Sequence, residues 1–405
     1  MQLNFPNTQT AEEPRTLANA AVWACGFRPF FLGGAALAAL LIGAWLVVFF
    51  GGHAMGGPAG AVGWHAHEML FGFVAAIIAG FLLTAVPKWT RTKTITGPKL
   101  IILFTLWLAG RAGLAMAGLI PYAAVAAVDV LFLPALATAI AVPIIRARTP
   151  RNLGFIPLLF GLATANAIFH LAHLGVVEAH LASLALDAAL AIIVVIVAII
   201  GGRVIPFFTV NKVGYGTVER RRPVDIAAII LSVAWLFSFI FWPTATVTGA
   251  LALGAGAANL GRMYGWATLK TKKVPLLWVL HAGYFFVGAG LVLYGLSVFQ
   301  LFDVPRSAAL HGLTAGAMGI LCLGMMARVS LGHTGRQLQA HPIMTVAFAL
   351  VVLAATIRTF VPWLAPEFYG PSITISGVLW TAAWVLFLII YVPILLSPRA
   401  DGRPG

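Results

Sequence analysis

The segment WHAHEMLFG, residues 64–72, places His65, His67 and Glu68 at the start of a long apolar run. These are groups that bind metals or transfer protons, and such groups are costly inside a bilayer. On a regular helix His65 and His67 point about 200° apart. They therefore serve different partners, unless His65 lies in a non-helical stretch before the span. Glu68 follows His65 by three residues and is expected to orient that imidazole.

Further histidines are expected at the same depth as this segment. His170 and His173 are three residues apart, so they share a helix face, with Asn166 one turn away. His180 and His311 fall near the same level. The simplest interpretation of a lone histidine at this depth is a hydrogen bond to a neighbouring helix or a position among the lipid headgroups. A cluster of histidines favours metal binding instead. The expected ligands are His65, His67, His170, His173 and His311.

The kind of metal is less constrained than its ligands. Neutral imidazole binds haem iron, copper and zinc alike. Cys25 and Cys322 are far apart and form no thiolate site, so haem or copper is favoured. Histidine spacing does not exclude zinc.

Two acids and two arginines are expected near the histidines. The simplest interpretation of Asp129 and Asp187 is ion pairing with Arg111 or Arg358. Alternatively, the two acids and Glu68 deliver protons, and the arginines bind carboxylates such as haem propionates. His281 lies apart, nearer the opposite face, and is a further candidate for cofactor binding.

The elements that must position these residues are apolar helices. The chain has 405 residues, of which 61% are hydrophobic and only 9% are charged, whereas about a quarter of a soluble domain is charged. This composition predicts an all-α, polytopic membrane bundle of about twelve spans. The predicted spans are 29–50, 66–87, 98–118, 122–145, 152–176, 180–203, 224–243, 246–268, 275–297, 306–329, 342–362 and 373–396.

Charge supports this organisation. The net charge of +14 does not indicate nucleic-acid binding, because most Lys and Arg residues fall in alternate loops between apolar runs. This alternation predicts cytoplasmic termini. We expect a cytoplasmic segment at 1–28, a transmembrane domain at 29–396 and a cytoplasmic tail at 397–405. The basic residues of GGRVIPFFTVN (201–211) and MMARVSLGHTGR (325–336), such as Arg203 and Arg328, are predicted to anchor the chain at the headgroups.

Several motifs resemble the NnrS family of bacterial inner-membrane proteins. They are GFRPFFL (26–32), WHAHEMLFGF (64–73), AVPKWT (85–90), GRVIPFFT (202–209) and LHGLTAGAMGILCLGMMARVSLGHTGR (310–336). The resemblance implies twelve spans, haem (haem b) and copper, and a role in the response to nitric oxide. The histidines inside the matching blocks are His65, His67, His311 and His333.

Three functions are compatible with these features. The first is reduction of nitric oxide (NO) to nitrous oxide at a haem–copper site, with quinol as electron donor and periplasmic protons carried by Glu68, Asp129 or Asp187. The second is a non-catalytic haem protein that binds NO or protects metal pools. The third, which the sequence supports least, is a transporter. Membrane lipid is an expected partner, and the sequence is compatible with an oligomer.

Overall fold

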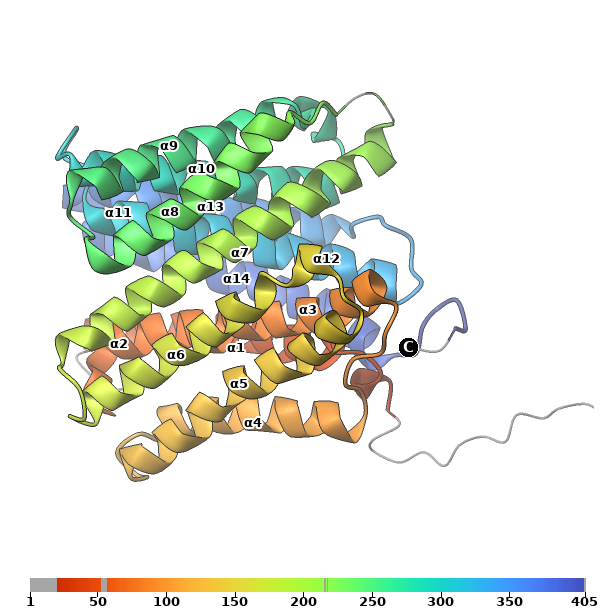
Figure 1. Cartoon of the computed structure of the whole chain (residues 1–405), viewed down its shortest axis with the longest axis horizontal. Helices are drawn as coiled ribbons and strands as arrows, with labels where there is room; N and C mark the ends of the chain where they lie inside the picture. The colour runs from red at the N-terminus through yellow and green to blue at the C-terminus, as the bar shows by residue number, and fades with distance from the viewer. Residues whose placement is uncertain (1–19, 52–56, 215, 217, 404–405) are drawn as a thin grey trace, which may run out of the picture.

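The structure is a computed structural model that describes residues 20–51, 57–214, 216 and 218–403. The described residues form a helical bundle without a β-sheet (Figure 1). Its α-helices are α1 (Phe27–Gly51), α2 (Gly60–His67), α3 (Ala75–Thr90), α4 (Pro98–Ala115), α5 (Tyr122–Arg146), α6 (Phe155–His173), α7 (His180–Val213), α8 (Arg222–Phe241), α9 (Thr246–Tyr264), α10 (Pro275–Val298), α11 (Arg306–His311), α12 (Ile320–His333), α13 (Pro342–Leu364) and α14 (Tyr369–Leu396).

Two pairs of these fourteen helices are joined without a break, which leaves twelve continuous helices. A π-helical segment, Glu68–Val74, joins α2 to α3, and another, Gly312–Gly319, joins α11 to α12. The helix from Gly57 to Thr90 and the helix from Arg306 to His333 are also among the three most buried candidate spans, with α10, since 83% and 72% of their most apolar windows lie inside the protein. The expected all-α membrane fold is confirmed.

Eleven of the helices are long and apolar enough to cross a membrane. The remaining one, α9, is less apolar because it carries Asn259 and Arg262, both buried. The hydroxyl of Tyr284 donates to Asn259 Oδ1 at 2.6 Å, and Arg262 Nε donates to Asp225 Oδ1 at 3.0 Å. Neighbouring helices therefore satisfy the polar groups of α9, as a span within a bilayer requires.

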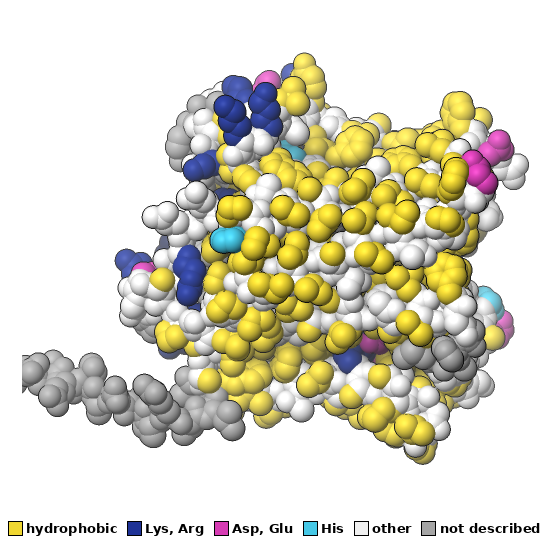
Figure 2. All heavy atoms as spheres, turned by 180° about the vertical axis from the view of Figure 1, so that it is seen from behind, with side chains coloured by type: hydrophobic (Ala, Val, Ile, Leu, Met, Phe, Trp, Pro, Cys, Tyr) yellow, Lys and Arg dark blue, Asp and Glu magenta, His cyan; other side chains and the backbone are white. Residues whose placement is uncertain are grey.

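Long, nearly parallel helices lie between two ends of different character. Side chains such as Leu40, Ile102 and Ile230 are exposed on the outer surface, as expected for contact with lipid. Lys and Arg side chains gather at one end (Figure 2). The described ends of the chain meet there, because Arg28 Nη1 donates to the carbonyl oxygens of Leu395 and Ser397, at 2.9 and 2.7 Å.

Helix α7 connects the two halves of the bundle. It runs diagonally between α4–α6 and α8–α10 (Figure 1). Its 34 residues span about 50 Å at 1.5 Å per residue. This length corrects the predicted span 180–203, since the helix continues through Pro206 to Val213. Arg203 is thus helical rather than in a loop, and it donates to Asn152 Oδ1 and to the carbonyl of Arg151.

Other predicted boundaries also shift. The predicted span 66–87 begins instead at Gly57, so WHAHE lies inside a helix rather than at its mouth. The predicted span 306–329 continues to His333, so Arg328 and His333 are helical. Within the expected cytoplasmic segment 1–28, residues 1–19 lie outside the described residues, and Arg28 is already in α1 and fully buried.

Helices α9 and α10 pack through matched glycines. A Cβ atom at Gly256 would lie 2.8 Å from the carbonyl oxygen of Gly288, and one at Gly295 would lie 2.8 Å from that of Gly249. Each pair is seven residues from the next, so one face of each helix is bare enough for the backbones to approach closely. Small residues at such interfaces are the usual means of tight helix packing in lipid.

The substitution Gly256→Ala is therefore expected to destabilise the protein by about 1–3 kcal/mol, because the added methyl group meets backbone that cannot rotate away. The free energy of unfolding in mixed micelles measures this effect. Gly254→Ala is the matched control on the same helix, since its Cβ would meet only Leu231 at 3.5 Å. Equal stability of the two variants would contradict the packing argument.

Candidate metal centre

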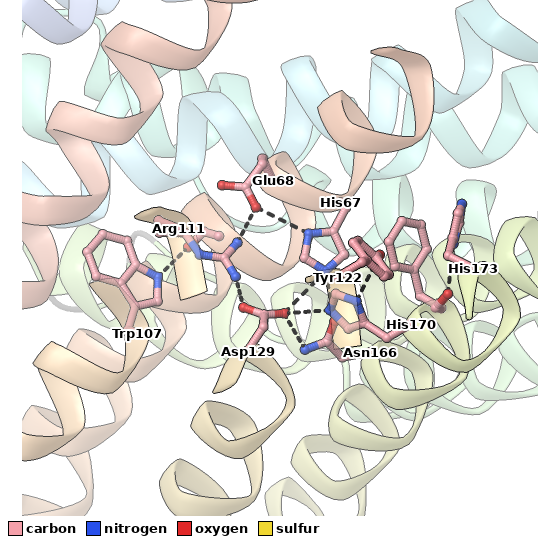
Figure 3. Close-up of polar contacts among 11 residues, drawn as sticks. His67, Glu68, Trp107, Arg111, Tyr122, Asp129, Asn166, His170 and His173 are labelled. Atoms are coloured by element: carbon pink, nitrogen blue, oxygen red, sulfur yellow. Dashed lines mark hydrogen bonds and ion pairs between the residues drawn. The ribbon is translucent and has the colours of Figure 1, made fainter. Parts of the chain in front are cut away.

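Three candidate ligands meet inside the bundle. His67 at the end of α2, Asp129 in α5 and His170 in α6 each offer an atom within 4.8 Å of the other two. Asp129 Oδ2 lies 3.4 Å from His67 Nε2 and 3.0 Å from His170 Nε2 (Figure 3). The three residues are only 1%, 2% and 1% exposed. Two imidazoles and one carboxylate form a donor set typical of transition-metal sites.

Asn166 and Tyr122 complete the hydrogen bonding of the two imidazoles. Asn166 Nδ2 donates to Asp129 Oδ2 at 2.9 Å, and its Oδ1 lies 2.8 Å from His67 Nε2. The hydroxyl of Tyr122 lies 3.0 Å from His170 Nδ1. With Nε2–H directed at Asp129, His170 accepts the Tyr122 proton at Nδ1. Metal binding through Nε2 would move the ring proton to Nδ1, where the Tyr122 oxygen accepts it.

Arg111 on α4 holds the carboxylates in place. Its Nη1 donates to Glu68 Oε1 at 2.5 Å, and its Nη2 donates to Asp129 Oδ1. The predicted pairing of Asp129 with Arg111 is thus observed. Glu68 contacts His67 Nδ1 at 3.2 Å, whereas the sequence analysis paired it with His65. The difference arises because Arg111, which Asp129 holds in place, draws the Glu68 carboxylate toward the His67 side of the helix.

Charge at the centre is unbalanced. The carboxylates of Glu68 and Asp129 carry two negative charges, and Arg111 supplies one positive charge. One more positive charge is needed for neutrality in this buried place. A proton on His67 can supply it, because that ring faces acceptor oxygens of Glu68 and Asn166 at its two nitrogens. A bound metal cation can supply it equally.

Two glycines make room for Arg111 and Asp129. A Cβ atom at Gly72 would lie 2.8 Å from Arg111 Nη1, and one at Gly110 would collide with Asp129 Oδ1. Trp107, one turn before Arg111 on α4, donates from Nε1 to the carbonyl oxygen of Gly72 at 3.0 Å. Trp107, Tyr122 and both glycines were not predicted from the sequence. The available signal was a glycine one helical turn after Glu68 (Gly72) and one directly before Arg111 (Gly110).

The helix geometry changes from α to π directly after two of the histidines. One π-helical segment begins at Glu68, after His67, and the other at Gly312, after His311. Such segments are rare and occur frequently at functional sites, since the wider turn re-aims the following side chains. The helices of His67 and His311 share this feature, whereas α6, which carries His170 and His173, is α-helical throughout.

His65 lies in a different environment from His67, as expected for residues two apart. Its ring stacks on Trp45 of α1 with ring centroids 4.4 Å apart, and its Nδ1 atom is buried with no hydrogen-bond partner. Arg358 of α13 acts electrostatically on both His65 and His311, and His65 acts on His311. His311 Nδ1 donates to the carbonyl oxygen of Ser307 at 2.7 Å, which leaves Nε2 as an acceptor. His65, His311 and Arg358 thus form a second group.

The remaining candidates lie outside both groups. His173 Nδ1 donates to the carbonyl oxygen of Phe169 at 2.8 Å. His281 is bonded to the hydroxyls of Thr209 and Thr268, at 3.0 and 2.9 Å. Asp187 pairs with Arg306 at 2.5 Å rather than with Arg111 or Arg358. The structure therefore brings His67 and His170 together but not His173, His281 or Asp187.

These features define a polytopic, all-helical membrane protein with a buried histidine–carboxylate centre. The model of the NnrS family, described as NnrS protein, matches residues 21–399. The chain belongs to the NnrS family. No curated protein gives a significant match to it.

Removal of the Arg111 charge tests the electrostatics of the centre. Arg111→Met is expected to destabilise the protein by about 3–5 kcal/mol, because it leaves two buried carboxylates without their common cation. Arg146→Gln, which removes an exposed arginine, is the control and should change stability by less than about 0.5 kcal/mol. Addition of Glu68→Gln to Arg111→Met should restore part of the loss. An Arg111→Met protein as stable as the wild type would refute the charge balance described here.

Proposed function

We propose that this protein reduces nitric oxide to nitrous oxide at a metal ion bound by His67, Asp129 and His170. The observation that carries the proposal is the convergence of these three buried ligand atoms within 4.8 Å of one another. The overall reaction balances with quinol as donor: two NO and one quinol give one N₂O, one water and one quinone. When bound, the metal supplies a binding position for NO and a path for electrons.

The donor chemistry supports a single metal ion at this centre. Two neutral imidazoles and one carboxylate suit copper, iron or zinc, and the net negative charge favours a cation. A haem does not fit between His67 and His170 as they stand. Their ring centroids are 5.1 Å apart at an interplanar angle of 67°, and Asn166 and Asp129 bond the ring nitrogens.

The second group is the better candidate for the haem that the family resemblance implies. His65 Nδ1 is buried without a partner, and His311 Nε2 has no hydrogen bond among the described residues, so either nitrogen can bind haem iron. Arg358 has no hydrogen bond or ion pair among the described residues, and a guanidinium suits a propionate. We therefore propose haem b at His65 or His311 and copper at His67, Asp129 and His170.

Proton delivery is proposed to begin at Tyr122. This residue is partly exposed at the first position of α5, and its hydroxyl lies 3.0 Å from His170 Nδ1. With Nε2 on the metal, the ring proton of His170 would lie at Nδ1 and donate to the Tyr122 oxygen, so that the Tyr122 hydroxyl could release its own proton toward the centre. Glu68 is the second proposed carrier, through His67 Nδ1. Asp187 is not included, because its carboxylate is held in a separate ion pair with Arg306.

The orientation of the protein follows from its charge. We place the end that carries the basic loops, together with both termini, in the cytoplasm of a bacterium, and the protein in its inner membrane. Tyr122 then faces the periplasm, which becomes the source of protons.

A non-catalytic role is the competing function. The ring nitrogens of His67 and His170, and the side chain of Asn166, all have partners within the protein. This closed network favours a non-catalytic protein, which binds NO at a haem or protects metal pools without turnover.

Purified protein with its metals retained distinguishes the two roles. With a soluble quinol, an NO electrode should record steady consumption of NO, with one N₂O formed per two NO. His67→Ala and His170→Ala should lose one metal ion per chain and the activity. His180→Ala is the control, since this histidine is exposed beside Glu178. NO binding without consumption by the wild type would reject the enzyme.

Tyr122→Phe tests proton delivery separately. Loss of the hydroxyl should lower the rate of NO consumption by about 10²–10⁴-fold, the usual contribution of a positioned acid or base, with metal content unchanged. The control is Tyr264→Phe, at a tyrosine that is 85% exposed. A rate equal to that of the wild type would exclude Tyr122 from the proton path.

A further inference from the structure

Arg328 is a buried cation far from both histidine groups. It lies on α12, five residues before the end of that helix at the basic end of the bundle, and it is only 7% exposed. Headgroup anchoring was predicted for this residue from the sequence, but a side chain this deeply buried does not reach the headgroups by itself. A side chain that only anchors a helix end reaches out to the surface.

Other buried arginines of the described chain have oxygen partners. Arg111 bonds two carboxylates, and Arg262 bonds Asp225, the Tyr284 hydroxyl and the carbonyl oxygen of Ala198. Arg328 has neither a hydrogen bond nor an ion pair with any described residue. Its guanidinium instead makes a cation–π contact with the ring of Phe208 on α7. The guanidinium carbon lies 4.0 Å from the ring centroid.

A cation–π contact does not replace an anion. Such contacts stabilise a cation by only a fraction of what the desolvation of a buried ion costs. The five N–H groups of a guanidinium also remain without acceptors. The arrangement therefore lacks a partner that carries both negative charge and acceptor oxygens.

A cleft of ≈ 720 Å³ lies at the end of α7 that follows Phe208. It is lined by Lys212, Lys273, Gln339, Thr345 and neighbouring apolar residues. Lys212 follows Phe208 by four residues, so the two share one face of α7. The cleft lies at the basic end, and Arg328 lies about 8 Å from the end of α12 at 1.5 Å per residue. Arg328 and Lys212 thus lie near the same end of the bundle, each within about one helical turn of Phe208 along α7 or in contact with its ring.

We propose that Arg328, with Lys212 at the mouth of the cleft, binds a phosphate group between α7 and α12. The planar guanidinium fork matches two phosphate oxygens, and Phe208 supports the fork from its other face. An anionic phospholipid headgroup and free inorganic phosphate both offer this group. The site is independent of the metal centre and of the proposed reaction.

The test uses the full-length protein in neutral detergent, with the thermal unfolding midpoint and native mass spectrometry as readouts. Phosphatidylglycerol, phosphatidylcholine and inorganic phosphate are added separately. Phosphatidylglycerol should raise the wild-type midpoint and remain bound in the mass spectrum, and phosphatidylcholine should do neither. An equal rise with inorganic phosphate assigns the site to free phosphate, and a rise with phosphatidylglycerol alone assigns it to lipid.

Arg328→Gln should weaken binding of the active anion at least tenfold, and Arg328→Lys should weaken it less. The matched control is Arg203→Gln, which removes an exposed charge of α7 at the same end. The proposal is overturned if neither anion stabilises the wild type, or if Arg328→Gln binds as tightly as Arg203→Gln. The wild-type measurement decides the matter even if Arg328→Gln fails to fold.

Discussion

The bridge from Arg111 to Glu68 and Asp129 is the interaction on which the rest of the centre depends. Three charges on α4, α5 and the α2–α3 helix are brought together in a place that water does not reach. Removal of any one leaves the others uncompensated, and that cost is far larger than the gain from any single neutral hydrogen bond. The bridge fixes both carboxylates, and the carboxylates fix His67 and His170.

Backbone geometry lets this bridge form. The π-helical turn after His67 and the missing side chains at Gly72 and Gly110 leave the space that the guanidinium and Asp129 fill. An extra methyl group at either glycine would separate α4 from its neighbours. The metal centre therefore depends on the irregular helix and on close packing, because polar groups can be buried only where their partners are within hydrogen-bond distance.

The hydrophobicity of the chain was enough to predict that it folds into membrane-spanning helices. It was not enough to predict where each helix begins and ends. Long apolar runs revealed the helices, but the depth of WHAHE was misjudged because the small, weakly apolar residues before Trp64 hide the true start of the helix at Gly57. The predicted span ended at Arg203, three residues before Pro206, yet α7 continues through both. Helices within membranes tolerate an internal proline when neighbours re-satisfy the freed backbone groups.

Partner choice within the site was only partly predictable. Spacing separated His65 from His67 correctly, because 100° per residue is a property of every α-helix. The pairing of Arg111 with Asp129 was among the expected ones. The contact of Glu68 with His67, and that of Asp187 with Arg306, depend on how distant helices are rotated against each other. No single helix encodes that rotation.

Charge balance links the two ends of the bundle. Near the histidines, two carboxylates face one guanidinium, so the centre is short of positive charge and is suited to a cation. At Arg328 a guanidinium faces an aromatic ring and no carboxylate, so the site is short of negative charge and is suited to an anion. An uncompensated charge costs more free energy within a bilayer than in water. An imbalance that persists in the protein alone therefore indicates both where a ligand belongs and which sign of charge it carries.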